Sequence, residues 1–367
     1  MIVYYSILAV ILYCGATKKL SEKYENSENI FLFIIAITLC FFAAVRSINI
    51  GADTDQYCSH FLHISNTKWT DLIHYYNKEN YYGDIEFGYK ISQKVLSVFK
   101  SQQVITIANS ILQIGLISIV IVKQSKDKWL SFFMYYTLCF YQTALNLTPS
   151  SYVSYFMFLS FPFIKDRKLI QFLCFIIIGM LFHTSAIFFL PLYFLSKIKI
   201  KKKTLSLLFC ISALIFIFYP IFIKILINIL PQSYVGYVDG SRGHRGNKIE
   251  LLVLLVQIIA MAFCAIQVDK KKIKKIVENN NIVLWLLIYE VLLYLLSMKA
   301  SMFQRGAFLF SPYVIIIVPN IICKIDSKNR RALTTVCMVI YGTILYLLRV
   351  HINNVGTTMP YAFFFND

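Results

Sequence analysis

The sequence predicts an all-α integral membrane protein that crosses the bilayer about twelve times. Hydrophobic residues make up 58% of its 367 residues and the mean hydropathy is +0.65, which leaves too little polar surface to cover a water-soluble globule. The apolar residues form long runs separated by polar loops. Lysine and arginine gather in those loops as short clusters, which is typical of cytoplasmic loops in membrane proteins.

Twelve apolar runs predict the helices. They lie at residues 2–16, 30–45, 104–122, 129–147, 150–164, 169–182, 185–196, 204–230, 249–268, 281–298, 307–323 and 332–348. The first run has no basic residue before it and is followed by Lys18 and Lys19, the reverse of a cleavable signal peptide. Since the chain shows no internal repeat, we expect one polytopic domain over residues 1–367.

The basic clusters fix the orientation of these helices. With Met1 outside, the dense clusters at 197–203 and 270–275 fall in short inside loops, as the positive-inside rule requires. Both termini then face the outside. The two longest polar loops, 46–103 and 231–248, and all six histidines lie outside. We therefore expect chemistry at the outer face, and we read the net charge of +18 as a topology signal rather than nucleic-acid binding.

The outer loop 46–103 is too long for a simple connection. Phe87, Ile91, Val95 and Val98 recur at helical spacing within it. This pattern predicts amphipathic helices that lie in the membrane interface and roof a cavity.

The runs at 169–182 and 185–196 are each too short to cross a hydrocarbon core of ~30 Å. Basic residues flank the pair on both sides, so both flanks belong on the same side of the membrane. The pattern predicts a short-helix hairpin whose tip, around His183, stops below the outer surface. Non-helical backbone at that depth is tolerated where it lines a wet cavity, so we expect His183 to face one.

The stretch from Arg46 to Tyr57 crowds polar residues against the end of an apolar run. Arg46 can fork onto phosphate oxygens, and Gly51 allows a sharp turn. Asp53 and Asp55 imitate the D-x-D motif that binds a metal in nucleotide-sugar transferases. Because nucleotide sugars are not expected outside the membrane, we predict no metal there; Asp53 is instead a candidate base, sugar clamp or partner of Arg46.

Four motifs occur in order along the chain. They are R-x-x-x-x-G-x-D-T-x-x-Y (Arg46, Gly51, Asp53, Thr54, Tyr57), E-x-G-Y (Glu86, Gly88, Tyr89), F-H-x-S-A (Phe182, His183, Ser185, Ala186) and R-G with a following aromatic (Arg305, Gly306, Phe308). Together they resemble the EpsG-like group of O-antigen polymerases, the Wzy proteins. The chain departs from that group at Asn146 to Ser151, where the family usually has an Arg-Gln pair.

The resemblance implies a GT-C-like membrane glycosyltransferase in the bacterial inner membrane. Such enzymes polymerise oligosaccharide repeat units carried on undecaprenyl diphosphate at the periplasmic face. The expected partners are that lipid-linked oligosaccharide, the bilayer and a chain-length regulator protein. No cofactor and no nucleic acid are expected.

This reaction needs cations for the diphosphate leaving group and a base for the acceptor hydroxyl. The residues predicted to bind the diphosphate are Arg46, Arg305, Arg242 and Arg245, the last two from a glycine-containing loop. The candidates for the base are Asp53, Glu86 and His183, with no choice among them. Tyr57 and Tyr89 are predicted to contact the sugar substrate.

Glu290 lies near the middle of the 281–298 run and supports an alternative. A bare charge there costs about 2.5–3.5 kcal/mol, so Glu290 is expected to be protonated or paired, with Lys224 as the candidate partner. A proton-coupled transporter would use such a residue. A transporter or flippase of lipid-linked oligosaccharide is therefore one alternative, and a transferase like the O-antigen ligases is another.

Overall fold

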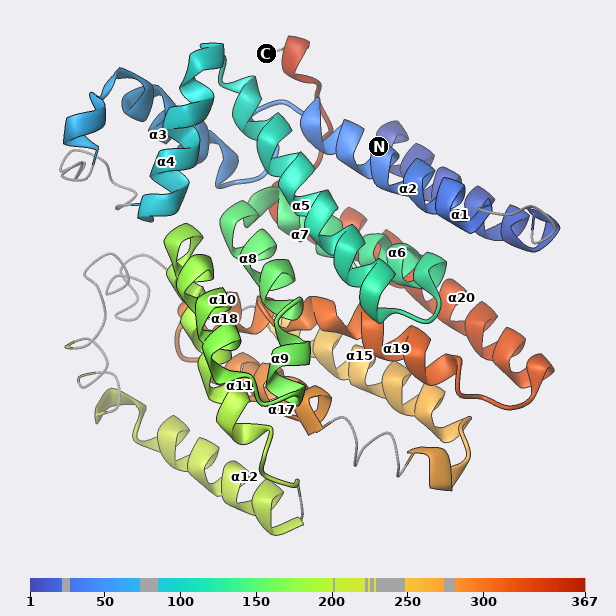
Figure 1. Ribbon diagram of the computed structural model, residues 1–367. Helices are drawn as coiled ribbons and strands as arrows, with labels where there is room; N and C mark the ends of the chain where they lie inside the picture. Colours follow the sequence, from blue (N-terminus) through green and yellow to red (C-terminus); the bar gives the residue numbers. More distant parts are fainter. Residues whose placement is uncertain are drawn as a thin grey trace. The chain divides into compact units, whose positions relative to one another are not determined.

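The computed structural model describes residues 1–21, 27–72, 85–200, 202–221, 224, 228, 248–273 and 281–366. Within these ranges every regular element is a helix, and the isolated β-bridge pairs Arg46 with Phe363 (Figure 1). Five of the described helices are long and apolar enough to cross a membrane. The prediction of an all-helical membrane protein is confirmed at this level, whereas the twelve crossings and the GT-C-like arrangement stay predictions.

The chain divides into two compact units, and each is described by itself. The first unit comprises Met1–Leu159, Ile177–Thr184 and Val314–Asp367, and the second comprises Ser160–Ile176 and Ser185–Tyr313. The first unit contains α1 (Ile2–Ser21), α2 (Ser27–Ala44), α3 (Thr54–Asn66), η1 (Trp69–Asp71), α4 (Phe87–Leu96), η2 (Ser97–Phe99), α5 (Gln103–Gln124), α6 (Lys128–Thr137), α7 (Phe140–Asn146), α8 (Thr148–Phe158), the end of α10 (Leu169–Phe182), α19 (Val314–Ile322), α20 (Lys328–Asn353), η5 (Val355–Thr357) and η6 (Phe364–Asn366).

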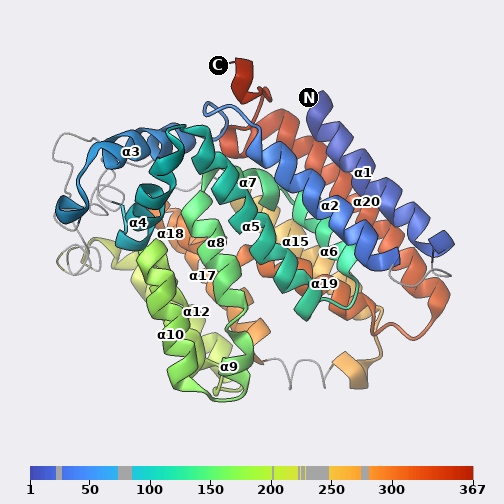
Figure 2. The ribbon, with the colours of Figure 1, turned by 45° about the horizontal axis from the view of Figure 1, so that its top comes forward.

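In the first unit α6 forms the centre of the core. It packs against α1, α19 and α20, and each of its residues from Leu130 to Thr137 is buried. The hydroxyl of Tyr136 donates to the carbonyl of Tyr4 at 2.6 Å, which fixes α1 on α6. Next to this group, α5 packs against both α2 and α8 (Figure 2).

The apolar run 129–147 is broken into α6 and α7, although its hydropathy is continuous. Cys139 at the break adopts a left-handed backbone with φ 63°. The break leaves helix carbonyls without partners, which is costly among apolar residues. The buried guanidinium of Arg349 on α20 supplies one donor, to the carbonyl of Leu138 at 2.9 Å.

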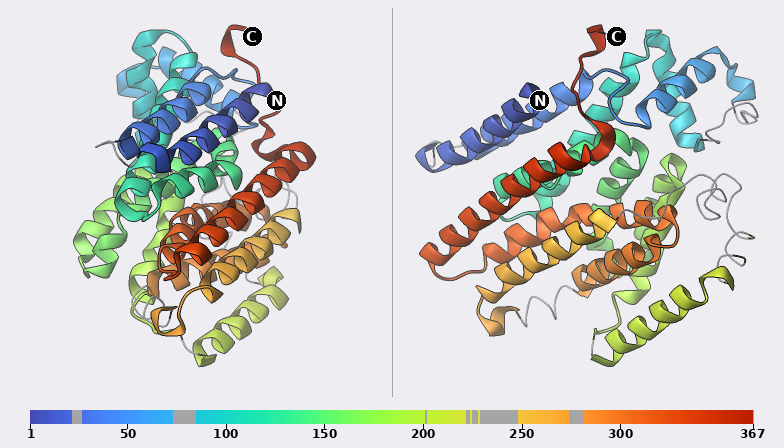
Figure 3. Two further views of the ribbon diagram at one scale, coloured as in Figure 1. Left: turned by 90° about the vertical axis from the view of Figure 1, so that its right-hand side faces the viewer. Right: turned by 180° about the vertical axis from the view of Figure 1, so that it is seen from behind.

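The C-terminal segment returns to the N-terminal helices, and the two chain ends lie close together (Figure 3). The Tyr4 hydroxyl donates to the carbonyl of Thr358 at 2.7 Å. The N–H of Ser47 donates to the carbonyl of Ala362 at 2.9 Å. The segment therefore holds the start of the loop that follows α2.

The described part of the loop predicted at 46–103 contains the α-helices α3 and α4 and the short 3₁₀ helices η1 and η2. Helix α4 buries polar residues and exposes apolar ones. Lys90 and Gln93 are buried, together with Tyr89. Phe87 and Val95, in contrast, are 44% and 54% exposed. Such an arrangement is unfavourable in water and favourable against lipid. The interfacial position of α4 nevertheless stays a prediction.

The second unit contains α9 (Phe161–Lys165), most of α10, η3 (Thr184–Phe189), α11 (Leu190–Leu195), α12 (Lys202–Ile217), α15 (Lys248–Ile266), α17 (Asn281–Ser297), α18 (Ser301–Phe308) and η4 (Ser311–Tyr313). Here α17 packs against α11, α15 and α18. Glu290 on α17 is 4% exposed, and its carboxylate accepts a 2.6 Å hydrogen bond from Ser311. The partner of Glu290 is thus Ser311 rather than Lys224.

Candidate functional site

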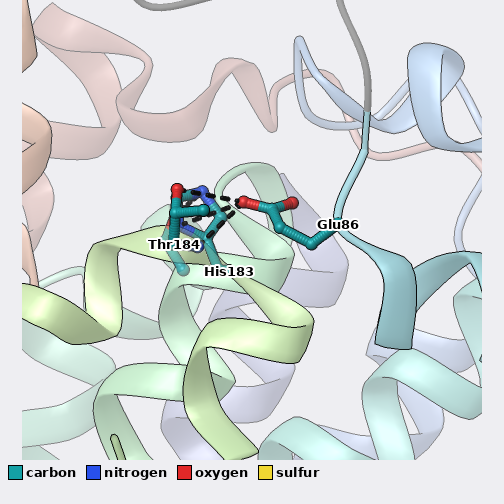
Figure 4. Close-up of polar contacts among 4 residues, drawn as sticks. Glu86, His183 and Thr184 are labelled. Carbon is teal, nitrogen blue, oxygen red and sulfur yellow. Dashed lines mark hydrogen bonds and ion pairs between the residues drawn. The ribbon is translucent and has the colours of Figure 1, made fainter. Parts of the chain in front are cut away.

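Glu86 meets the end of α10 in the first unit (Figure 4). Its Oε1 atom accepts hydrogen bonds from the backbone N–H of Thr184 at 2.9 Å and from the Thr184 hydroxyl at 3.3 Å. The Nδ1 atom of His183 lies 4.0 Å from the same oxygen. Two of the three predicted base candidates, Glu86 and His183, are therefore neighbours.

The E-x-G-Y motif explains how Glu86 reaches this position. Glu86 directly precedes α4 and has an extended backbone, and its side chain makes no hydrogen bond to the helix. Gly88, in the first turn of α4, lies so close to α10 that an added Cβ would be 2.7 Å from the carbonyl oxygen of Leu181. Only glycine allows this approach. The motif therefore supplies both the Glu86 carboxylate and, at Gly88, the close helix contact that brings this carboxylate to the C-terminal end of α10.

Ser150 extends the cluster on the other side of the imidazole. Its Oγ lies 3.1 Å from His183 Nε2. Two residues later, Tyr152 packs edge-on against Phe182 with ring centroids 6.1 Å apart. Sequence reasoning missed Ser150, because nothing in its local sequence indicates that the start of α8 meets the tip of α10.

Tyr57 and Tyr89 also lie together, with ring centroids 5.8 Å apart in an edge-on arrangement. The Tyr89 hydroxyl accepts from Asn109 at 3.2 Å, and burial raises the pKa of this phenol above its ordinary value. Tyr89 is 3% exposed, whereas Tyr57 is half-buried. Tyr57 is therefore the more accessible of the two predicted sugar contacts.

Asp53 precedes α3, with its backbone N–H donating to Asn146 Oδ1 at 2.8 Å. The turn before it requires Gly51, which has φ 90° and whose added Cβ would lie 2.9 Å from the carbonyl of Leu145. The loop that starts at Arg46 is thus packed on α7. Among the described residues, no group of three or more His, Cys, Asp or Glu side chains has a metal-binding arrangement.

Arg46 lies in the interior of the first unit and is 1% exposed. Its guanidinium donates to the carbonyls of Ala43 at 2.5 Å and Leu145 at 3.3 Å, near the last turns of α2 and α7, and to the hydroxyl of Ser110 at 3.4 Å. A cation is favourable at helix C-termini. Burial lowers the pKa of Arg46. These contacts hold two helix ends; diphosphate binding by Arg46 stays a prediction.

The remaining predicted diphosphate contacts lie elsewhere in the chain. Arg305 is exposed in the last turn of α18, in the second unit. Arg242 and Arg245 fall outside the described residues.

Comparison with known proteins identifies the family. The model of the EpsG family matches residues 29–363. No curated protein and no solved structure matches the chain. Because the family match covers nearly the whole sequence and includes all four motifs, this chain belongs to the EpsG family.

Proposed function

We propose that the protein is a membrane glycosyltransferase that polymerises undecaprenyl-diphosphate-linked oligosaccharide repeat units at the outer face of the bacterial inner membrane. Family membership supports a membrane polymerase. The pair of hydrogen bonds from Thr184 to Glu86 Oε1 is the single observation on which the proposed mechanism rests. The proposal includes a GT-C-like arrangement of about twelve crossings, periplasmic termini and a chain-length regulator as partner.

Glu86 is the best placed of the three candidates for the base. Both donors of Thr184 bind its Oε1, while Oε2 has no hydrogen-bond partner among the described residues. The side chain is 16% exposed, so Glu86 lies in a largely enclosed position that is still open to solvent. A carboxylate held at one oxygen and open at the other suits proton abstraction from a hydroxyl.

In the proposed reaction an acceptor sugar hydroxyl attacks the anomeric carbon of the growing chain. The new C–O bond forms as the bond to the lipid diphosphate breaks, and Glu86 Oε2 takes the hydroxyl proton. We assign the sugar-facing roles to Tyr57 and Asp53. The four arginines predicted from the sequence, Arg46, Arg242, Arg245 and Arg305, remain the proposed contacts of the departing diphosphate.

The test is polymerisation by the purified protein in lipid nanodiscs, with a lipid-diphosphate repeat unit as substrate and product length as readout. We expect Glu86→Gln to lower kcat by about 10²–10⁴-fold, the range for loss of a general base. The matched control is Glu28→Gln. Glu28 pairs with Lys128 at 2.9 Å and its side chain is 44% exposed, so its loss should leave activity unchanged.

Two outcomes contradict the proposal. Wild-type product lengths from Glu86→Gln would exclude Glu86 as the base. Movement of the lipid-linked unit across vesicles with no increase in glycan length would favour the flippase alternative instead.

A further inference from the structure

The proposed reaction gives no step to His183 or to Ser150. Ser150 lies in the first turn of α8, and its hydroxyl is 3.1 Å from His183 Nε2. We propose that Ser150 is a positioning residue that fixes the His183 imidazole so that its Nδ1 edge faces Glu86. This inference rests on the proposed function, because it assigns Ser150 a role through the base of that reaction.

The contacts on the two sides of the ring differ in length. The 4.0 Å between His183 Nδ1 and Glu86 Oε1 is too long for a hydrogen bond, whereas the 3.1 Å between His183 Nε2 and Ser150 Oγ is within hydrogen-bond range. The last torsion of a histidine side chain also has a broad energy minimum. A partner at the opposite nitrogen removes this freedom, and Ser150 is at the right distance to be that partner.

The hydroxyl of Ser150 suits both protonation states of the ring. When His183 is neutral, Ser150 can donate to Nε2, which places the ring hydrogen on Nδ1, facing Glu86. When His183 is charged, Nε2–H can donate to Ser150 instead. The hydroxyl changes from donor to acceptor by rotation, so an N–H edge faces the carboxylate in either state. An N–H edge attracts the carboxylate of Glu86, whereas a ring lone pair at the same place would repel it.

Packing around Ser150 makes it a firm support. Helix α8 packs against α5 and α7, which fixes the backbone at its start. On the same helix, Tyr152 is 3% exposed and contacts Phe182, the residue before His183. The Ser150 hydroxyl and the His183 imidazole therefore belong to two segments, α8 and the end of α10, that already contact each other.

The test is a double-mutant cycle with steady-state kinetics in nanodiscs. We expect Ser150→Ala to lower kcat about five- to tenfold, the rate equivalent of one hydrogen bond, and to leave KM within about twofold. Ser150→Thr keeps the hydroxyl and should restore kcat. In the His183→Gln protein, Ser150→Ala should cause no further loss, because Ser150 acts through the ring. Ser151→Ala, one position away, is the control.

The outcomes separate this inference from the proposed function. Wild-type kcat in Ser150→Ala, with Glu86→Gln inactive, would overturn the role of Ser150 alone. That role is also overturned if Ser151→Ala lowers kcat equally or if Ser150→Thr fails to restore it. It is overturned as well if the kcat losses of Ser150→Ala and His183→Gln multiply in full in the double variant. Wild-type kcat in Glu86→Gln would refute the proposed base itself.

Discussion

A single methyl group at Gly88 would test whether the approach of α4 to α10 controls Glu86. In Gly88→Ala the new Cβ would lie 2.7 Å from the Leu181 carbonyl oxygen, whereas ordinary contact begins at 3.4 Å. The helices must therefore separate by about 0.7 Å, because the Leu181 oxygen belongs to the backbone of α10 and the new Cβ is fixed directly to the backbone of α4. The same shift would lengthen the 2.9 Å bond from Thr184 to Glu86 to about 3.6 Å, beyond hydrogen-bond range.

The expected result is a fall in kcat of roughly 10–100-fold, because misplacing a catalytic group by about 1 Å has effects of this size. Overpacking should also lower the free energy of unfolding by about 1–3 kcal/mol. Product formation in nanodiscs and thermal unfolding measure the two effects. Gly115→Ala on α5 is a matched control, since no heavy atom lies within 4 Å of its added Cβ. Equal kcat in the two alanine variants and the wild type would refute the reasoning.

Two further predictions concern buried charges. Arg46→Lys loses the planar guanidinium that binds several acceptors. It should therefore lower the unfolding temperature more than Arg305→Lys, which changes an exposed side chain. An Arg46→Lys protein that is stable but loses lipid-diphosphate binding would instead support a ligand role. Glu290→Gln keeps an acceptor for Ser311 without a charge, so unfolding temperature and polymerisation should match the wild type, and loss of activity would contradict this.

The motifs could be found in the sequence because they combine uncommon residues at fixed spacing. The break after Phe182 was predictable from the shortness of two apolar runs, and the structure ends α10 at that residue. Glu86 and His183 were both identified as candidates. That they would meet was not predictable, because their contact spans 97 positions along the chain.

Other features depend on packing, which local sequence does not encode. The burial of Arg46 arises because α7 and the C-terminal segment close over the end of α2. The break at Cys139 has no Gly or Pro to indicate it and depends on a distant donor, Arg349. Hydropathy also could not show which face of α4 is buried.

The exposed apolar face of α4 affects how substrate would reach Glu86. This face begins at Phe87, the residue next to the proposed base. If hydrocarbon covers it, a lipid-linked substrate arrives by diffusion within the plane of the bilayer. Encounter then depends on the number of substrate molecules per unit of membrane area rather than per volume. We expect rates to rise as the same amount of substrate is confined to less lipid, and to fall when inert lipid is added.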